Sequence, residues 1–301
     1  MKKKIKSDFS TLKLVSSIVL AIYALIMISL LLWGFVSSFK TNREFSLGAN
    51  PNILGWPREF TFENYDKVIH NLDVTVRRNG VKMQISFGWQ IAYTLIYAIG
   101  GCLLSALAPF LVAYACSRFR FKFNKVIEVI VVITMSLPIV GSEAAMVSML
   151  NNLGSYDTLQ GVMSQKFSFA NMYFLIYYAS LRNVSKEYSE AACIDGATEL
   201  QIMVRIIFPI IRSLFFTVAL LYFIQYWNDY QTPLMYMPSY PTLSYGIFDL
   251  TSQSNRPASA KLNYEVVKLA GAIILVFPIL VIFIILKKNI MTNLSLGGVK
   301  E

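Results

Sequence analysis

Charged side chains are scarce in this sequence. Asp, Glu, Lys and Arg make up 15% of its 301 residues, whereas an average soluble domain carries roughly 25%. One His and three Cys leave too few ligands for a typical metal site and too few thiols for a disulfide framework. Cys102 and Cys116 fall in an apolar run and Cys193 in a polar one, so we expect three reduced thiols. The composition argues against a soluble domain and a disulfide-rich secreted protein.

A second absence concerns nucleotide chemistry. The phosphate-binding pattern G-x-x-x-x-G-K-[ST] does not occur, and no grouping of His, Cys and Asp suggests a catalytic or metal site. We therefore expect a protein that is not an enzyme and does not hydrolyse ATP itself. If ATP drives its function, ATP and Mg must bind to another subunit.

Long apolar runs are what the sequence has instead, since 55% of its residues are hydrophobic. A helix needs about 20 apolar residues to cross a bilayer core of roughly 30 Å. The clearest run has no Asp, Glu, Lys or Arg and includes Pro109, where a helix can bend. The runs predict an all-α membrane protein with six transmembrane helices, at residues 14–36, 85–117, 126–150, 167–181, 210–227 and 266–286.

The first and third of these runs have features that other structures share. The first follows a basic start, which is also typical of a secretory signal peptide. It is long enough to cross a bilayer and no small-residue cleavage site follows it, so we interpret it as an uncleaved span. The third contains Leu137-Pro138, and we expect a break there.

The Lys and Arg residues that give the chain its net charge of +10 are distributed unevenly between the segments that separate the predicted spans. They are frequent at both ends of the chain and in residues 118–125, and several more lie in or beside residues 187–209: Arg182, Lys186, Arg205 and Arg212. This bias marks the cytoplasmic side of a membrane, so we expect lipid and not nucleic acid as the partner of this charge. The prediction is a cytoplasmic N-terminus (1–13), a six-span domain (14–288) and a cytoplasmic tail (289–301).

Residues 187–209 form a polar interruption between two apolar runs. Glu and Ala favour a helix before Asp195-Gly196, where glycine permits the positive φ of a turn. The stretch predicts a compact helix–turn–helix on the membrane surface, called the knob below. Apolar residues recur at helical spacing in its two halves: Tyr188, Ala191, Ala192 and Ile194, then Leu200, Met203, Val204 and Ile207.

The knob resembles the cytoplasmic coupling motif of ABC importer permeases, which is EAA, three residues, G, nine residues, I-x-L-P. In that family the motif docks in a cleft of a separate ATPase subunit. The alanines allow close approach, the glycine sets the turn and the glutamate anchors electrostatically. The other interpretation is an amphipathic cytosolic loop of an unrelated membrane protein. The matching residues are Glu190, Ala191, Ala192, Gly196, Ile206 and Pro209, with Asp195 before the glycine and Phe208 in place of the leucine.

The fifth apolar run ends in residues 226–230, YWNDY. Aromatic rings at the end of a span are often anchors at the headgroup level. The pattern W-N-D-[FY]-x-x-P-L also resembles a signature of sugar-importer permeases, where this span lies near the translocation path. In that interpretation Tyr226 and Trp227 stack on sugar faces, while Asn228 and Asp229 bind hydroxyl groups.

Three ionisable residues fall inside predicted spans: Glu128, Glu143 and Arg212. Such groups are costly in hydrocarbon and usually face protein or water. Glu128 and Arg212 are near enough to the cytoplasmic ends to snorkel. Glu143 lies deep in the third span. It is either a structural pair with Arg212 or a partner subunit, or a polar residue that lines the sugar path.

The end of the chain resembles the G-L-x-x-G-A-V-K-G ending of carbohydrate-importer permeases. Gly297, Gly298 and Lys300 fall at its inner positions, whereas Asn293 and Glu301 replace its outer glycines. In relatives this tail reaches between the ATPase subunits, so the resemblance implies the same contact here.

From residue 37 to residue 300 the chain resembles permease subunits of carbohydrate ABC importers of the maltose-transporter type. The resemblance implies the type I importer permease fold in a bacterial cell membrane. It also implies a second homologous permease, two cytoplasmic ATPases that hold ATP and Mg, an extracellular solute-binding protein and an oligosaccharide substrate. An ion-coupled secondary transporter is the main alternative, and it would need inverted repeats or broken ion-site helices but no knob. A structural or enzyme-anchoring membrane protein is the third.

Overall fold

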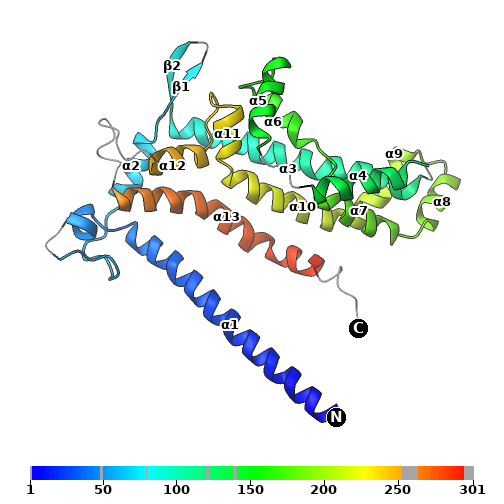
Figure 1. The fold of residues 1–301 in the computed structure, drawn as a ribbon, viewed down its shortest axis with the longest axis horizontal. Helices are drawn as coiled ribbons and strands as arrows, with labels where there is room; N and C mark the ends of the chain where they lie inside the picture. Colours follow the sequence, from blue (N-terminus) through cyan, green and yellow to red (C-terminus); the bar gives the residue numbers. More distant parts are fainter. Residues whose placement is uncertain are drawn as a thin grey trace. The chain divides into compact units, whose positions relative to one another are not determined.

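Helices dominate the computed structural model, which describes residues 2–47, 50–78, 80–119, 122–137, 141–252 and 264–294 (Figure 1). The chain divides into two compact units, Met1–Leu72 with Leu250–Val276 and Asp73–Asp249 with Phe277–Glu301. In chain order the elements are α1 (Lys2–Ser37), the π-helical η1 (Arg43–Leu47), α2 (Glu63–Asn71), β1 (Val74–Arg78), β2 (Val81–Ile85), α3 (Phe87–Arg118), α4 (Asn124–Ser136), α5 (Glu143–Asn152), α6 (Leu159–Lys166), α7 (Met172–Arg182), α8 (Glu187–Ile194), α9 (Glu199–Ile202), the π-helical η2 (Met203–Ile207), α10 (Phe208–Asn228), α11 (Gln231–Tyr236), α12 (Leu243–Ser252) and α13 (Glu265–Leu294).

Four helices of the described chain are long and apolar enough to cross a membrane. They confirm the first, second, fifth and sixth predicted spans, and Pro109 lies inside α3 without ending it. The third and fourth predicted spans consist of shorter helices. The four long helices are Lys13–Ser37 within α1, Phe87–Arg118, Glu199–Asn228 and Glu265–Ile285 within α13.

The third predicted span, residues 126–150, is two helices, α4 and α5. Leu137 at the end of α4 is extended, with φ −85° and ψ 115°, because a following proline disfavours helical backbone in the residue before it. Gly141 then adopts a φ of +79°, and a new helix starts at Glu143. The break is where the sequence predicts it, but it removes Glu143 from the middle of a helix.

The fourth predicted span was placed too early, at residues 167–181. Helix α7 starts at Met172, because the side chain of Asn171 caps it by accepting hydrogen bonds from the amides of Tyr173 (3.0 Å) and Phe174 (3.4 Å). Its 11 residues span about 16 Å, less than the roughly 30 Å of a bilayer core.

The fifth predicted span, residues 210–227, is part of a longer helix. The chain stays helical from Glu199 to Asn228, so the second half of the knob and the span are one element rather than two. Pro209 lacks an amide hydrogen and normally breaks a helix. Here the turn before it is π-helical, and the amide of Phe208 bonds back to the carbonyl of Met203. This wider turn accommodates the proline near the start of α10.

The second unit is held together by α3, α7 and α10, which pack along one another. Phe110 of α3 is buried at their centre. Its ring lies 5.9 Å from the rings of both Tyr177 on α7 and Phe215 on α10, in edge-to-face contacts. Such pairs stabilise a helical core beyond simple burial of area. This three-helix core connects the knob to the opposite end of α10.

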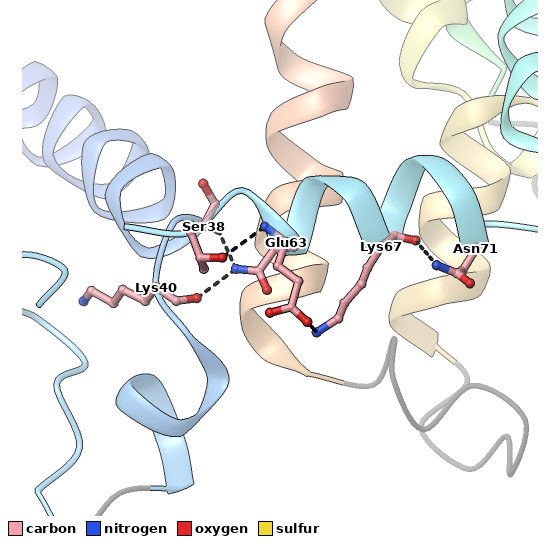
Figure 2. Close-up of polar contacts among 7 residues, drawn as sticks. Ser38, Lys40, Glu63, Lys67 and Asn71 are labelled. Atoms are coloured by element: carbon pink, nitrogen blue, oxygen red, sulfur yellow. Dashed lines mark hydrogen bonds and ion pairs between the residues drawn. The ribbon is translucent and has the colours of Figure 1, made fainter. Parts of the chain in front are cut away.

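In the first unit, hydrogen bonds hold the backbone that follows α1 against α2. The side-chain amide of Asn64 on α2 is buried and donates to the carbonyls of Ser38 and Lys40, at 2.8 Å each. On the same helix Glu63 pairs with Lys67 at 2.8 Å (Figure 2). These bonds fix the backbone that follows α1.

Helix α1 is packed very little within the subunit. None of its most apolar window is buried against the part of the chain that the structure describes. The apolar side chains between Leu14 and Phe35 are therefore left for lipid or for another protein to cover.

Strands β1 and β2 form an antiparallel hairpin directly before α3. The hairpin is not among the elements predicted from the sequence. Val74, Val76 and Ile85 of the hairpin are buried and pack against Tyr93 of α3 and Tyr245 of α12. The all-α class therefore holds for the membrane helices, while the segment before α3 adds a small sheet.

Candidate functional site

The turn of the knob is built on Gly196. Its φ is +81°, a left-handed conformation that costs non-glycine residues energy. Its amide donates to the carbonyl of Cys193 at 3.1 Å, which closes α8. An ideal Cβ at this position would meet no atom within 4 Å. The requirement for glycine is thus one of backbone conformation and not of space, as the sequence predicts.

The second half of the knob starts with a capping box. The hydroxyl of Thr198 accepts from the amide of Gln201 at 3.4 Å, and the side chain of Gln201 accepts from the amide of Thr198 at 2.9 Å. Two of the free amides at the helix start are satisfied in this way. The orientation of α9 after the turn is therefore fixed by local bonds.

The burial of the knob's apolar side chains does not follow the simple amphipathic pattern of the sequence. Ile202, which the sequence analysis did not single out, is fully buried together with Ile207. In contrast, Ile194 is 86% and Leu200 is 66% exposed, and Tyr188 and Val204 are exposed as well. Large apolar side chains gathered on an exposed surface indicate contact with another protein.

A cleft of about 370 Å³ lies between the knob and the end of α3. Arg118, Lys186, Glu190 and Glu199 are among the residues that line it. The Nε and Nη2 atoms of Arg118 are buried and have no hydrogen-bond partner among the described residues. Charged groups of both signs therefore meet beneath the knob.

The predicted coupling residues lie on α8, on the turn after it, on η2 and at the start of α10. Most are accessible to a partner, including Glu190 at the side of α8 and Gly196 at the turn. Ala192 is buried, whereas most of the motif is not. Of the others, Ala191, Asp195 and Pro209 are exposed and Ile206 is half-buried.

The opposite end of α10 carries a second group of polar residues around Asp229. One carboxylate oxygen accepts from the hydroxyl of Tyr97 at 2.6 Å, and the other accepts from the amide of Thr232 at 3.0 Å. The carbonyl of Asp229 accepts from the hydroxyl of Ser244 at 2.7 Å. Asp229 thus joins α3, α10 and the start of α12.

Lys166 at the end of α6 completes this group, called the Asp229 cluster below. Its ammonium lies 4.4 Å from the ring centre of Tyr226 and 5.2 Å from that of Tyr97, which are cation–π distances. Burial lowers the pKa of Lys166, and the Asp229 carboxylate opposes this by favouring the charged form. The hydroxyl of Tyr226 also bonds to that of Ser105, at 2.7 Å.

The predicted sugar-binding rings are enclosed by the subunit itself. Tyr226 is 6% and Trp227 is 4% exposed, so neither presents a free ring face. The side chain of Asn228 is exposed, and its amide donates to the carbonyl of Ile224 at 2.8 Å. Sugar stacking by the two rings stays a prediction, with Asn228 the more accessible residue.

Glu143 is exposed in the first turn of α5 and not in the middle of a span. A carboxylate is favourable there because the amides at a helix start attract negative charge. No ion pair joins it to Arg212 in the described chain. Burial raises the pKa of Tyr236 on α11, and the carboxylates of Glu143 and Asp229 raise it further. Glu143 and Asp229 therefore both lie within electrostatic range of Tyr236.

Some residues of the candidate site carry no sequence signal, and some predicted residues lie outside the described part of the chain. Tyr97 and Lys166 lie far from Asp229 in the sequence, Tyr236 follows Asp229 by seven positions, and none of the three belongs to a recognised motif. The predicted tail contacts, Gly297, Gly298 and Lys300, lie outside the described residues.

Comparison with known proteins identifies the family. A model described as "Binding-protein-dependent transport system inner membrane component" matches residues 105–292. A probable permease of a transport system for starch degradation products from Thermoanaerobacterium thermosulfurigenes is 25% identical over 271 residues, 88% of this chain and 89% of that protein. A maltodextrin transport permease of Bacillus subtilis is 28% identical over 212 residues, 69% of this chain and 73% of that protein.

The fold is also known from a solved structure. A chain of a bacterial ABC transporter involved in the import of the acidic polysaccharide alginate matches with a TM-score of 0.72 at 22% identity, over 91% of this chain and 95% of that chain. The fold is therefore that of a type I ABC importer permease, as the sequence predicts. The chain belongs to the family of binding-protein-dependent transport system inner membrane components, and it is a multi-pass permease subunit of the bacterial plasma membrane.

Proposed function

We propose that this chain is one of two permease subunits of an ATP-driven importer of oligosaccharides. Similar proteins are named as permeases for starch degradation products, arabinooligosaccharides and maltodextrins, which supports this substrate class. The assembly contains a second homologous permease, two cytoplasmic ATPase subunits that bind ATP and Mg, and an extracellular solute-binding protein.

The observation that carries the proposal is the continuity of the knob with α10. The helix from Glu199 to Asn228 has 30 residues, which corresponds to about 45 Å. One end belongs to the knob and the other reaches the Asp229 cluster. An ATPase that moves the knob therefore moves the far end of the same helix, and this biases the subunit between inward-facing and outward-facing states.

The exposed face of the knob is the docking site for the ATPase. The apolar residues Ile194 and Leu200 supply area for a partner cleft, and Glu190 supplies a charge beside it. Gly196 holds the two halves at the angle that presents both. Ala191, Ala192, Asp195, Ile206 and Pro209 complete the motif, and the tail residues Gly297, Gly298 and Lys300 add a contact between the ATPases.

The sugar path runs past the opposite end of α10. Glu143 and Asn228 are accessible there and offer groups that bind hydroxyls. Tyr226, Trp227 and Asp229 form the wall behind them through the contacts of the Asp229 cluster. In this arrangement the knob and both termini are cytoplasmic, and the hairpin before α3 is extracellular.

Reconstituted transport tests the proposal. The complete complex, purified through a tag on this chain, is placed in proteoliposomes with its solute-binding protein and the oligosaccharide that mass spectrometry finds bound to that protein. We expect uptake that needs both ATP inside and binding protein outside. Uptake driven by a proton or sodium gradient without ATP would instead establish the ion-coupled alternative.

A further inference from the structure

The hairpin formed by β1 and β2 has two faces of different character. Its register places Arg77 directly opposite Lys82 and Thr75 opposite Gln84. Because side chains alternate along a strand, these four residues share one face. All four are exposed. This surface is called the basic face below.

The other face packs the hairpin against α3 and α12 of the same unit. Val74, Val76 and Ile85 are buried there against Tyr93 and Tyr245. Arg78 also lies on this face, where its guanidinium donates to the hydroxyl of Tyr240 at 2.6 Å and covers the Tyr240 ring at 4.8 Å. A lone two-stranded hairpin is marginally stable in water. These contacts therefore hold the basic face in a defined position.

The charges on the basic face are not compensated. Like charges directly opposite each other destabilise a strand pair, yet Arg77 and Lys82 occupy such a position. In the described part of the chain neither residue forms an ion pair with an acidic side chain. Because no acidic side chain of the described residues pairs with them, the two exposed cations are available to an acidic surface of another molecule.

The position of the hairpin identifies the side of the membrane on which that molecule lies. The hairpin precedes the start of α3, whereas the knob lies near the other end of α3 (Figure 1). The 32 residues of α3 separate the two ends by about 48 Å. Trp89, 61% exposed, marks the headgroup level in the first turn of α3. The hairpin therefore lies beyond the interface, on the side opposite the knob.

We propose that the basic face docks the extracellular solute-binding protein through an acidic patch on that protein. The inference rests on the proposed function, which supplies such a partner on this side. A flat, exposed face with two cations lacks the concave shape that sugars need, and lipid headgroups lie at the level of Trp89. Charge complementarity of this kind increases the rate of encounter and sets the orientation of docking.

Charge reversal tests the assignment. The double variant Arg77→Glu/Lys82→Glu and the control Lys122→Glu/Lys125→Glu change the net charge equally, and the control residues are exposed near the other end of α3. Each complex is placed in nanodiscs of phosphatidylcholine, and binding of the solute-binding protein is measured. We expect the apparent Kd to rise about tenfold or more in the hairpin variant only, and to approach the wild-type value at high salt.

Several outcomes would overturn the inference. An unchanged Kd in the hairpin variant would show that Arg77 and Lys82 only protect the sheet edge from pairing. An effect confined to nanodiscs with added phosphatidylglycerol would assign the face to the membrane. Basal ATP hydrolysis by the complex confirms that both variants are assembled. If wild-type uptake needs ATP and binding protein while Kd is unchanged, this inference fails and the proposed function stands.

Discussion

Replacing Gly196 by proline is expected to abolish ATP-driven uptake while the permease still inserts. Proline requires a φ near −65° and has no amide hydrogen, whereas Gly196 has a φ of +81° and donates to Cys193. A proline in an incompatible position costs about 3 kcal/mol, which leaves roughly a hundredfold fewer knobs in the docking conformation. Uptake per complex and recovery of the ATPase on a tagged permease are the measurements.

The matched control is Gly196→Asn. Asparagine tolerates the left-handed conformation, and a Cβ at this position meets nothing within 4 Å. We expect this variant to keep uptake within about threefold of wild type. Equal activity of the proline and asparagine variants would show that the turn geometry does not matter for coupling.

Replacing Asp229 by leucine is expected to reduce the yield of assembled complex severely. The hydroxyl of Tyr97 then loses its acceptor, at a cost of about 1–3 kcal/mol, and the ammonium of Lys166 loses its nearby negative charge. Proteins are stable by only about 5–15 kcal/mol, so the combined loss is a large fraction. Size-exclusion yield and thermal unfolding of the purified complex measure the effect.

The double variant Asp229→Leu/Lys166→Met separates charge balance from simple loss of packing. Removing the ammonium as well leaves no unbalanced charge, and we expect it to restore part of the lost yield. Additive losses in the two single variants would mean that Lys166 and Asp229 do not interact. In that case the cluster would not be the unit described above.

Local features explain why much of this fold is predictable from sequence. Each long span is a continuous apolar run, and the bilayer thickness sets its length. The turn at Gly196 follows from one residue type that tolerates positive φ. The end of α4 at Leu137 follows from the proline after it. None of these predictions needs a contact between distant residues.

Other features depend on contacts that sequence patterns do not show. The hairpin packs Val74 and Ile85 against the nearby Tyr93 and against Tyr245, which is distant in the chain. The Asp229 cluster depends on Tyr97, 132 positions away. Glu143 was misplaced because an apolar run shows that a segment is buried but not where a helix restarts within it.

Site-specific cross-linking of the knob tests the central claim most directly. A benzophenone amino acid is placed at position 194, where Ile194 is 86% exposed on α8, and as a control at position 81, where Val81 is exposed on the hairpin. Both complexes are illuminated after their ATP-driven uptake has been verified. We expect a covalent adduct between this chain and an ATPase subunit from position 194 and none from position 81. An active complex that gives no ATPase adduct from position 194 would contradict the claim.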